Sequence, residues 1–278
     1  MIDGFDYKEP RCNLCGGKEF YNPKLDTPSE IIPVQRIIEK ADRFYERNQL
    51  EDAESLLNYW KNEAYGVRDR KGELALLNEL LGVYRKLNNK EKCLKTIDRS
   101  LELINTLYKD INVSTATIML NVATAYKSLK MSEKAVEIYM QVENIYQQKL
   151  DMSDLKFAGL YNNLALALVD EKKYKGAEEY YLKALEILKE KEGQNNDMAI
   201  TYVNMSHLYE DMYDNNKKVV ECLYNAYGLL TEEKVEKDGY YAYVCGNCAP
   251  SFRYFGFEII AKELEQISEK TYERIRNS

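Results

Sequence analysis

Proline and glycine are scarce in this sequence. The chain of 278 residues contains five prolines and 13 glycines, and the rest is rich in Leu, Ala, Glu, Lys and Tyr. Apolar residues recur at spacings of three and four, which is typical of helices with one buried face. Hydrophobic residues make up 45% and charged residues 31% of the chain, which is the balance of a folded protein with a core and excludes a disordered chain. Helix is therefore expected almost throughout.

Long apolar runs and blocks of positive charge are also missing. No segment approaches the roughly 18 apolar residues of a membrane-spanning helix, and residues 1–13 lack the basic start and apolar run of a signal peptide. A cytoplasmic protein is therefore expected. The net charge is −7, and Lys and Arg are interleaved with Glu and Asp along the chain. This distribution predicts that neither nucleic acid nor an acidic membrane is a partner.

Catalytic motifs are absent as well. His207 is the single histidine, and neither a Gly-rich loop nor an evident nucleophile accompanies it in the sequence. The sequence contains no phosphate-binding loop, no dinucleotide fingerprint and no HExxH motif, and its many carboxylates do not converge around one point. The chain is therefore predicted not to be an enzyme.

What the sequence does contain is a repeat. A small or apolar residue that would open the second helix of a helix pair recurs at intervals of 40, 42, 42, 42 and 42 residues, at Ala53, Cys93, Ala135, Ala177, Val219 and Ala261. Ahead of each, a first helix carries a small or apolar residue and, three positions later, an aromatic residue or Leu: Phe44, Tyr84, Tyr126, Leu168, Tyr209 and Phe252. Both lie on one helical face. A fixed period of this length is typical of solenoids, in which stacked helix pairs share a continuous core.

One segment of the repeat carries a family resemblance. Residues 160–188, LYNNLALALVDEKKYKGAEEYYLKALEIL, resemble the tetratricopeptide repeat in their small residue, their Lys-Tyr turn and the paired Ala177 and Ala184. The period of 42 exceeds the family's usual 34 and is similar to the extended repeats of kinesin light chains and of bacterial peptide-sensing regulators. The resemblance implies an all-α fold, a right-handed α-α superhelix (solenoid) of about six helix pairs.

The expected domains are an irregular N-terminal arm at residues 1–29 and the repeat array at residues 30–278. The array is divided into units at 30–66, 72–108, 113–150, 154–191, 196–232 and 239–276. The arm has no helical period. The sequence Thr27-Pro28-Ser29-Glu30 is typical of a capping box, so it predicts that the first helix begins there.

The resemblance implies that a protein or peptide binds to the concave wall formed by the first helices. Asn recurs at one register of these helices, at Asn121, Asn163, Asn204 and Asn247. Asn is a mediocre helix former whose amide can donate to and accept from a peptide backbone, and similar Asn residues contact cargo peptides in kinesin light chain-like arrays. The alternative is that these amides bond between adjacent units and set their register. Further candidate contacts are Asn162, Lys127, His207 and Arg253.

Two cysteine pairs have the CxxC spacing of zinc sites. Cys12 and Cys15 precede two glycines, as in a zinc-ribbon knuckle, and Cys245 and Cys248 lie in the predicted first helix of the sixth unit. The pairs are 230 residues apart, where about 15–20 is expected, so one chain could barely join them. Burial in the core explains the second pair without any metal.

Three functions therefore remain open. The favoured one is a scaffold or adaptor that binds a protein or peptide. The second is a ligand-sensing regulator that acts through a separate effector protein. The third is an assembly module in which zinc joins two chains into a homodimer, or in which Cys222 and His207 complete a site with the second cysteine pair. Apart from this zinc, no cofactor is predicted.

Overall fold

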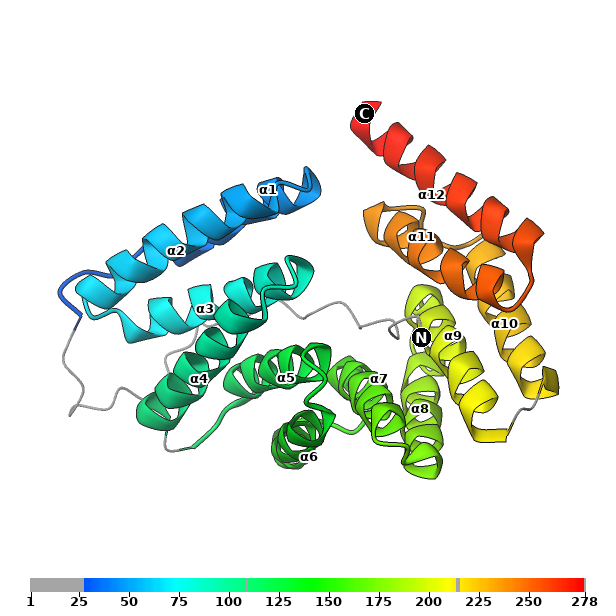
Figure 1. Ribbon diagram of the computed structural model, residues 1–278, viewed down its shortest axis with the longest axis horizontal. Coiled ribbons are helices and arrows are strands. Elements are labelled where there is room, and N and C mark those ends of the chain that lie inside the picture. Colours follow the sequence, from blue (N-terminus) through cyan, green and yellow to red (C-terminus); the bar gives the residue numbers. More distant parts are fainter. Residues whose placement is uncertain (1–27, 109, 214–215, 278) are drawn as a thin grey trace. The chain divides into compact units, whose positions relative to one another are not determined.

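The computed structural model describes residues 28–108, 110–213 and 216–277, and in these ranges it is all-α (Figure 1). Its 12 described helices are α1 Val34–Glu46, α2 Leu50–Gly66, α3 Arg70–Lys86, α4 Lys90–Leu107, α5 Val113–Ser128, α6 Ser132–Lys149, α7 Leu155–Asp170, α8 Tyr174–Lys189, α9 Asn195–Tyr213, α10 Asn216–Thr231, α11 Gly239–Tyr254 and α12 Glu258–Asn277. Consecutive helices pack as pairs. The predicted all-α fold of about six sequential helix pairs is confirmed. None of the described helices is both long and apolar enough to cross a membrane.

The helices form two compact units. The N-terminal unit, within Glu9–Leu150, contains α1 to α6, and the C-terminal unit, within Asp151–Ser278, contains α7 to α12. In the N-terminal unit α3 contacts its partner α4 and also α1, α2 and α5. In the C-terminal unit α9 occupies the same central place, against α10 and against α7, α8 and α11. The middle first helix of each unit is therefore enclosed by its neighbours on several sides.

The turns inside five of the helix pairs are built in the same way, and the turn between α9 and α10 includes residues outside the described ranges. One turn residue has a positive φ, at Asn48, Asn88, Lys130, Lys172 and Gly256, positions that follow the period of the sequence repeat. The N–H of the next residue donates to a carbonyl five residues earlier, as from Asn89 to Tyr84 at 2.9 Å. This is a Schellman ending, which closes the first helix with a left-handed residue. The recurring aromatic residue or Leu therefore marks the last turn of the first helix.

Tyrosine supplies much of the core. Tyr139 and Tyr146 of α6 are fully buried, and their hydroxyls lie 2.8 Å from Thr124 Oγ1 and 3.2 Å from Thr117 Oγ1 of α5. A buried tyrosine needs such a partner because an unpaired hydroxyl in the core is costly. The high tyrosine content is thus explained in part by helix pairs that combine large rings with small hydroxyl residues.

The first helix begins later than predicted. α1 starts at Val34 and has no side-chain cap. The backbone N–H and the hydroxyl of Ser29 instead donate to the carbonyl of Val67, at 2.9 and 3.2 Å. The N–H of Ile32 donates to Asp69 Oδ2 at 3.1 Å. The prediction of a capping box is wrong, because the polar groups of this segment bond to the turn between α2 and α3. Residues 1–27 of the predicted arm lie outside the described residues.

Substitutions at the turn should change stability through backbone conformation alone. Gly256 has a φ of +84°, and a Cβ there would meet no heavy atom within 4 Å. Gly256→Ala should lower the free energy of unfolding by about 1 kcal/mol, because an L-residue is strained in the left-handed region. Lys172→Gly, at the equivalent turn, should raise it by about 0.5 kcal/mol. Urea unfolding measures both changes. Equal shifts of the unfolding free energy in the same direction would contradict the left-handed conformation assigned to these two turn residues.

Removing the Asp69 cap of α3 should lower stability more than removing the comparable Asn89 cap of α4. Its buried carboxylate caps α3 by accepting from Gly72 N–H at 2.9 Å and also accepts from Ile32 N–H. Asn89 caps α4 by accepting only from Lys92 N–H, at an exposed site. Asp69→Ala should lower the free energy of unfolding by about 2 to 3 kcal/mol, because it also leaves a buried N–H unpaired. Asn89→Ala should cost about 1 kcal/mol in the same urea titration.

Candidate functional site

The predicted row of asparagines lies on first helices, but its members have different environments. Asn121 of α5, Asn163 of α7 and Asn204 of α9 are 0 to 3% exposed. Asn247 of α11 is exposed, and its Nδ2 donates to the carbonyl of Tyr243 at 2.8 Å. Positions that are equivalent in the sequence repeat are therefore not equivalent on the surface.

Two of the buried amides connect neighbouring helix pairs. Asn121 Nδ2 donates to Asn78 Oδ1 at 2.9 Å, from α5 to α3, and Asn162 Nδ2 donates to Thr201 Oγ1 at 2.7 Å, from α7 to α9. The bond of Asn121 is of the kind that the register alternative predicts for the row, and Asn162, which precedes a member of the row, makes a similar bond. The Oδ1 atoms of Asn121 and Asn162 are buried and accept no hydrogen bond in the described part of the chain. Such unpaired acceptors are uncommon in protein cores.

The C-terminal unit presents aromatic and polar side chains on α9 and α11. Tyr243, Asn247 and Tyr254 lie at helical spacing on one side of α11, and the two tyrosines are 41% and 56% exposed. The Tyr254 hydroxyl donates to Glu210 Oε1 of α9 at 3.0 Å, which joins the two helices. We define the α9–α11 face as Tyr243, Asn247, Pro250 and Tyr254 of α11 with His207 and Glu210 of α9.

His207 is held at this face by aromatic and polar contacts. Its ring centroid lies 5.7 Å from that of Tyr254 and 4.9 Å from that of Phe255. Its Nε2 lies 3.0 Å from Ser251 Oγ, and its Nδ1 lies 4.0 Å from Glu210 Oε2. Burial lowers the pKa of His207, which favours the neutral ring.

The Ser251, His207 and Glu210 side chains resemble the order of a catalytic triad, but two features oppose that function. Ser251 is 4% exposed, so its hydroxyl is closed to a substrate. The 4.0 Å between His207 and Glu210 exceeds hydrogen-bond length, so the carboxylate does not orient the ring. The contact to Ser251 therefore positions the histidine.

Lys127 and Arg253 lie in different surroundings from the α9–α11 face. Lys127 of α5 is buried, in the N-terminal unit. Arg253 of α11 binds Glu265 of α12 through two bonds of 2.8 Å and Glu258 at 3.1 Å. Arg253 therefore connects the two helices of its own pair. Peptide contacts by these two residues stay a prediction.

The cysteines of the second pair are core residues. Cys245 and Cys248 of α11 are fully buried free thiols, and burial raises the pKa of Cys245 to about 11. No three His, Cys, Asp or Glu side chains of the described residues come together as metal ligands, so Cys222 and the histidine do not complete a site with this pair. Cys12 and Cys15 lie outside the described residues. A zinc site made by both pairs therefore stays a prediction.

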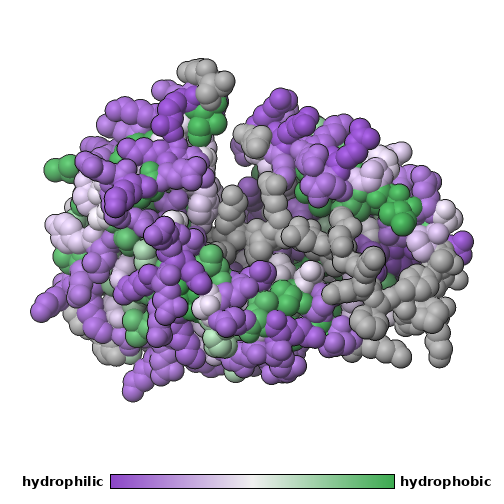
Figure 2. Space-filling model, turned by 180° about the vertical axis from the view of Figure 1, so that it is seen from behind, coloured by the Kyte–Doolittle hydropathy of each residue, from purple (hydrophilic) through white to green (hydrophobic). Residues whose placement is uncertain are grey.

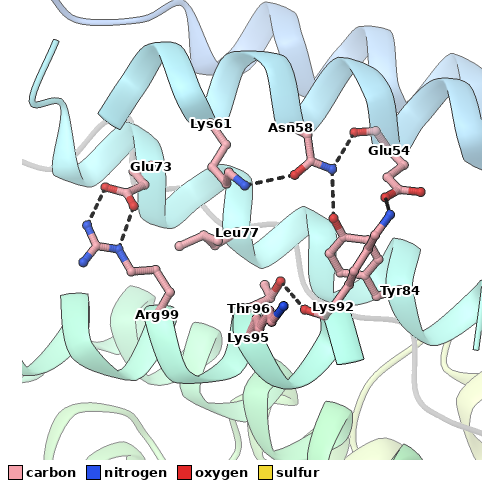
Figure 3. A pocket seen from close by; sticks show the side chains of 10 residues that line it. All are labelled: Glu54, Asn58, Lys61, Glu73, Leu77, Tyr84, Lys92, Lys95, Thr96 and Arg99. Carbon is pink, nitrogen blue, oxygen red and sulfur yellow. Dashed lines mark hydrogen bonds and ion pairs between the residues drawn. The ribbon is translucent and has the colours of Figure 1, made fainter. Parts of the chain in front are cut away.

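The N-terminal unit contains a charged cavity that the sequence did not reveal. It is an open pocket of about 360 Å³ between α2, α3 and α4 (Figure 3). Its lining residues are Glu54, Asn58, Lys61, Glu73, Leu77, Tyr84, Lys92, Lys95, Thr96 and Arg99. Most of them belong to second helices, whereas the search of the sequence concentrated on first helices. The spacing of Lys92, Lys95 and Arg99 along one side of α4 is the signal that could have indicated it.

Elsewhere the surface is mainly hydrophilic. Figure 2 shows apolar side chains in separate patches on the face opposite to that of Figure 1. The exposed large apolar residues are likewise spread over several helices, as with Tyr59 on α2, Met140 on α6 and Leu182 on α8. Scattered apolar residues of this kind are ordinary on protein surfaces and do not by themselves define an interface.

Comparison with known proteins identifies the repeat. Residues 116–149 and 158–187 match the family model of the tetratricopeptide repeat. No curated protein matches the chain in sequence. Nearly identical TPR-like repeats of a Podosopora anserina kinesin light chain superpose with a TM-score of 0.52 and 15% identity, over 73% of this chain and 96% of that one.

Two further solved structures cover more of the chain. BtubC (BKLC) from P. vanneervenii has a TM-score of 0.51 and 19% identity, over 89% of this chain and 94% of its own. The apo form of RapI has a TM-score of 0.53 and 15% identity, over 89% of this chain and 100% of its own. The chain therefore contains tetratricopeptide repeats at residues 116–149 and 158–187, and it shares the helix-pair fold of these arrays.

Proposed function

We propose that the chain is a non-enzymatic scaffold that binds a protein or peptide segment through the α9–α11 face. Tetratricopeptide repeats generally mediate protein interactions, and such scaffolds are typically not catalytic. The observation that carries the proposal is the exposure of Tyr243 and Tyr254 on one side of α11, with the amide of Asn247 between them. Exposed aromatic side chains with a polar tip are frequent anchors of protein interfaces.

The chemistry of this face favours a particular kind of segment. The Nδ2 of Asn247 donates within its own helix, which leaves the amide oxygen to accept a backbone N–H of the partner. The carboxylates of Glu210 and Asp211 border the face, and Glu210 raises the pKa of Tyr254 by accepting its hydroxyl hydrogen. A peptide that combines an apolar side chain for the tyrosines with a positive charge for the carboxylates fits this surface best.

The buried amides are assigned a different role in this proposal. Asn162 is fully buried and already donates to Thr201 of the next pair. A peptide would have to separate these helices before reaching it. We infer that Asn121 and Asn162 set the register between pairs, while Asn247 contacts the partner. Asn163 and Asn204, the other buried asparagines of the row, stay candidate contacts in addition to the residues of the α9–α11 face.

Loss of the exposed tyrosines should weaken peptide binding. Peptides selected from a displayed random dodecapeptide library on the full chain would be measured by fluorescence anisotropy. Tyr243→Ala and Tyr254→Ala should each weaken the selected peptide at least about tenfold, because anchor residues carry most of the binding energy. Tyr59→Ala removes an equally exposed ring from α2 and should leave the affinity unchanged. Failure to select any peptide, or an equal loss in the Tyr59 variant, would contradict the proposal.

Two asparagine variants separate register from binding. Asn162→Ala should lower the free energy of unfolding by about 1 to 3 kcal/mol, because it removes a buried bond between helix pairs. It should leave the affinity for the selected peptide within about twofold. Asn247→Ala should show the reverse pattern, with little change in stability and a clear loss of affinity. Urea unfolding and anisotropy on the same samples distinguish the two, and reversed results would assign the peptide contact to the buried Asn162.

A further inference from the structure

The charged cavity of the N-terminal unit lies outside the proposed peptide surface and has chemistry of its own. We propose that this cavity binds a carboxylate or phosphate group and that Lys61 is the main residue that contacts the anion. The cavity lies between the second helices α2 and α4, and residues of α3 line it as well (Figure 3). Its lining includes four cationic and two anionic side chains, in a chain whose net charge is −7. The local positive charge is therefore opposite in sign to that of the whole chain.

One end of the cavity is occupied by a complete ion-pair network. Arg99 of α4 binds Glu73 of α3 through two bonds, Nε to Oε1 at 2.7 Å and Nη2 to Oε2 at 3.0 Å. Arg70 binds the same carboxylate at 3.0 Å, and Arg99 also donates to Glu102 at 2.8 Å. Glu73 is only 3% exposed and is neutralised by two arginines. Glu73 therefore has its ion pairs with the two arginines, and it acts on Lys61 through its charge without forming an ion pair with it.

The other end of the cavity is also paired. Lys92 of α4 forms an ion pair with Glu54 of α2, and this partner raises the pKa of Lys92. Asn58 Nδ2 donates to the Tyr84 hydroxyl at 2.8 Å. Lys95 binds Glu91 on the exposed side of α4, where such a pair is weak and competes with solvent. Glu54 is therefore not available to neutralise the middle of the cavity.

Lys61 lies between these two paired ends and has no ion-pair partner among the described residues. Its Nζ donates to Asn58 Oδ1 at 3.0 Å, which is an uncharged acceptor, and Figure 3 shows the side chain directed into the cavity. Burial lowers the pKa of Lys61, although Glu73 opposes this shift through its charge. A partly buried ammonium without a carboxylate is destabilised, and a bound anion would restore the missing interaction.

The cavity indicates the size and charge of what binds. Its volume of about 360 Å³ lies at the lower end of small-ligand sites. Leu77 is the one aliphatic residue in the lining, and each of the other nine lining residues carries a polar or charged group. Lys61 has two N–H groups left for an anion, and Lys95 stands at the rim. Phosphate or carboxylate oxygens match these donors, whether they come from a free small anion or from an acidic side chain of a partner protein.

Titration of the full chain with defined anions tests the site. Inorganic phosphate, citrate and a hexaglutamate peptide would be added separately in isothermal calorimetry, with ionic strength held constant by chloride. At least one should bind with one site per chain, and Lys61→Gln should weaken that binding at least about tenfold, because a charge-assisted bond is lost. Lys61→Arg keeps the charge and should bind within about threefold. Lys40→Gln removes an exposed charge from α1 and should have no effect.

The comparison of probes identifies the source of the anion. Tighter binding of phosphate or citrate indicates a free small molecule, and tighter binding of hexaglutamate indicates an acidic segment of a partner. Binding of none of them, or equal weakening by Lys61→Gln and Lys40→Gln, would overturn the proposal.

A measurement on the unmodified chain guards against a misfolded variant. The bound anion should raise the pKa of Lys61 and so protect it at least about fivefold from acetylation, read by peptide mass mapping, while Lys40 keeps its rate. An unchanged acetylation rate of Lys61 in the presence of the bound probe would also overturn the proposed anion site.

Discussion

The structure depends on one packing constraint, which is that a helix pair cannot bury its apolar face alone. α5 is buried at every position from 115 to 127 and α7 at every position from 157 to 168. Helices buried in this way have no polar face to place in water, so their polar residues must find partners inside the protein. Asn121, Asn162 and Thr124 do so by bonding to α3, α9 and α6 respectively. Stacking therefore determines both where the core lies and how the repeats are connected.

The same constraint separates connecting residues from candidate binding residues. Where a first helix is enclosed, as for Asn162, the amide is used between pairs, and where it is open, as for Asn247, the amide and the neighbouring tyrosines face the surroundings. The charged cavity also follows from stacking, which places charged side chains of α2, α3 and α4 around one space. Glu73 and Arg99 are brought together across 26 residues of sequence. The lack of an ion-pair partner for Lys61 among the described residues is a property of that arrangement and of no single helix.

The local features of the fold were open to prediction from the sequence. The period of 40 to 42 residues located six helix pairs, because the small residues, the aromatic residues and the turns recur together. The left-handed residues at Asn88, Lys130 and Lys172 follow the same period, since each closes the same kind of helix ending. The start of α1 could not be predicted in this way. The sequence Thr27-Pro28-Ser29-Glu30 has the pattern of a capping box, but Ser29 and Ile32 bond to Val67 and Asp69, which local sequence does not reveal.

The sequence by itself determined the helices, their pairing and their turns, because these depend on residues within one repeat of each other. Tertiary structure alone decided which equivalent positions are buried. Asn163 and Asn247 occupy the same register, yet one is 2% exposed and the other is open, since burial depends on the neighbouring pairs. Cys245 and Cys248 likewise have the spacing of metal ligands but lie in the core of α11. A spacing reports which chemistry a segment could perform, and only the packing around it decides whether that chemistry is accessible.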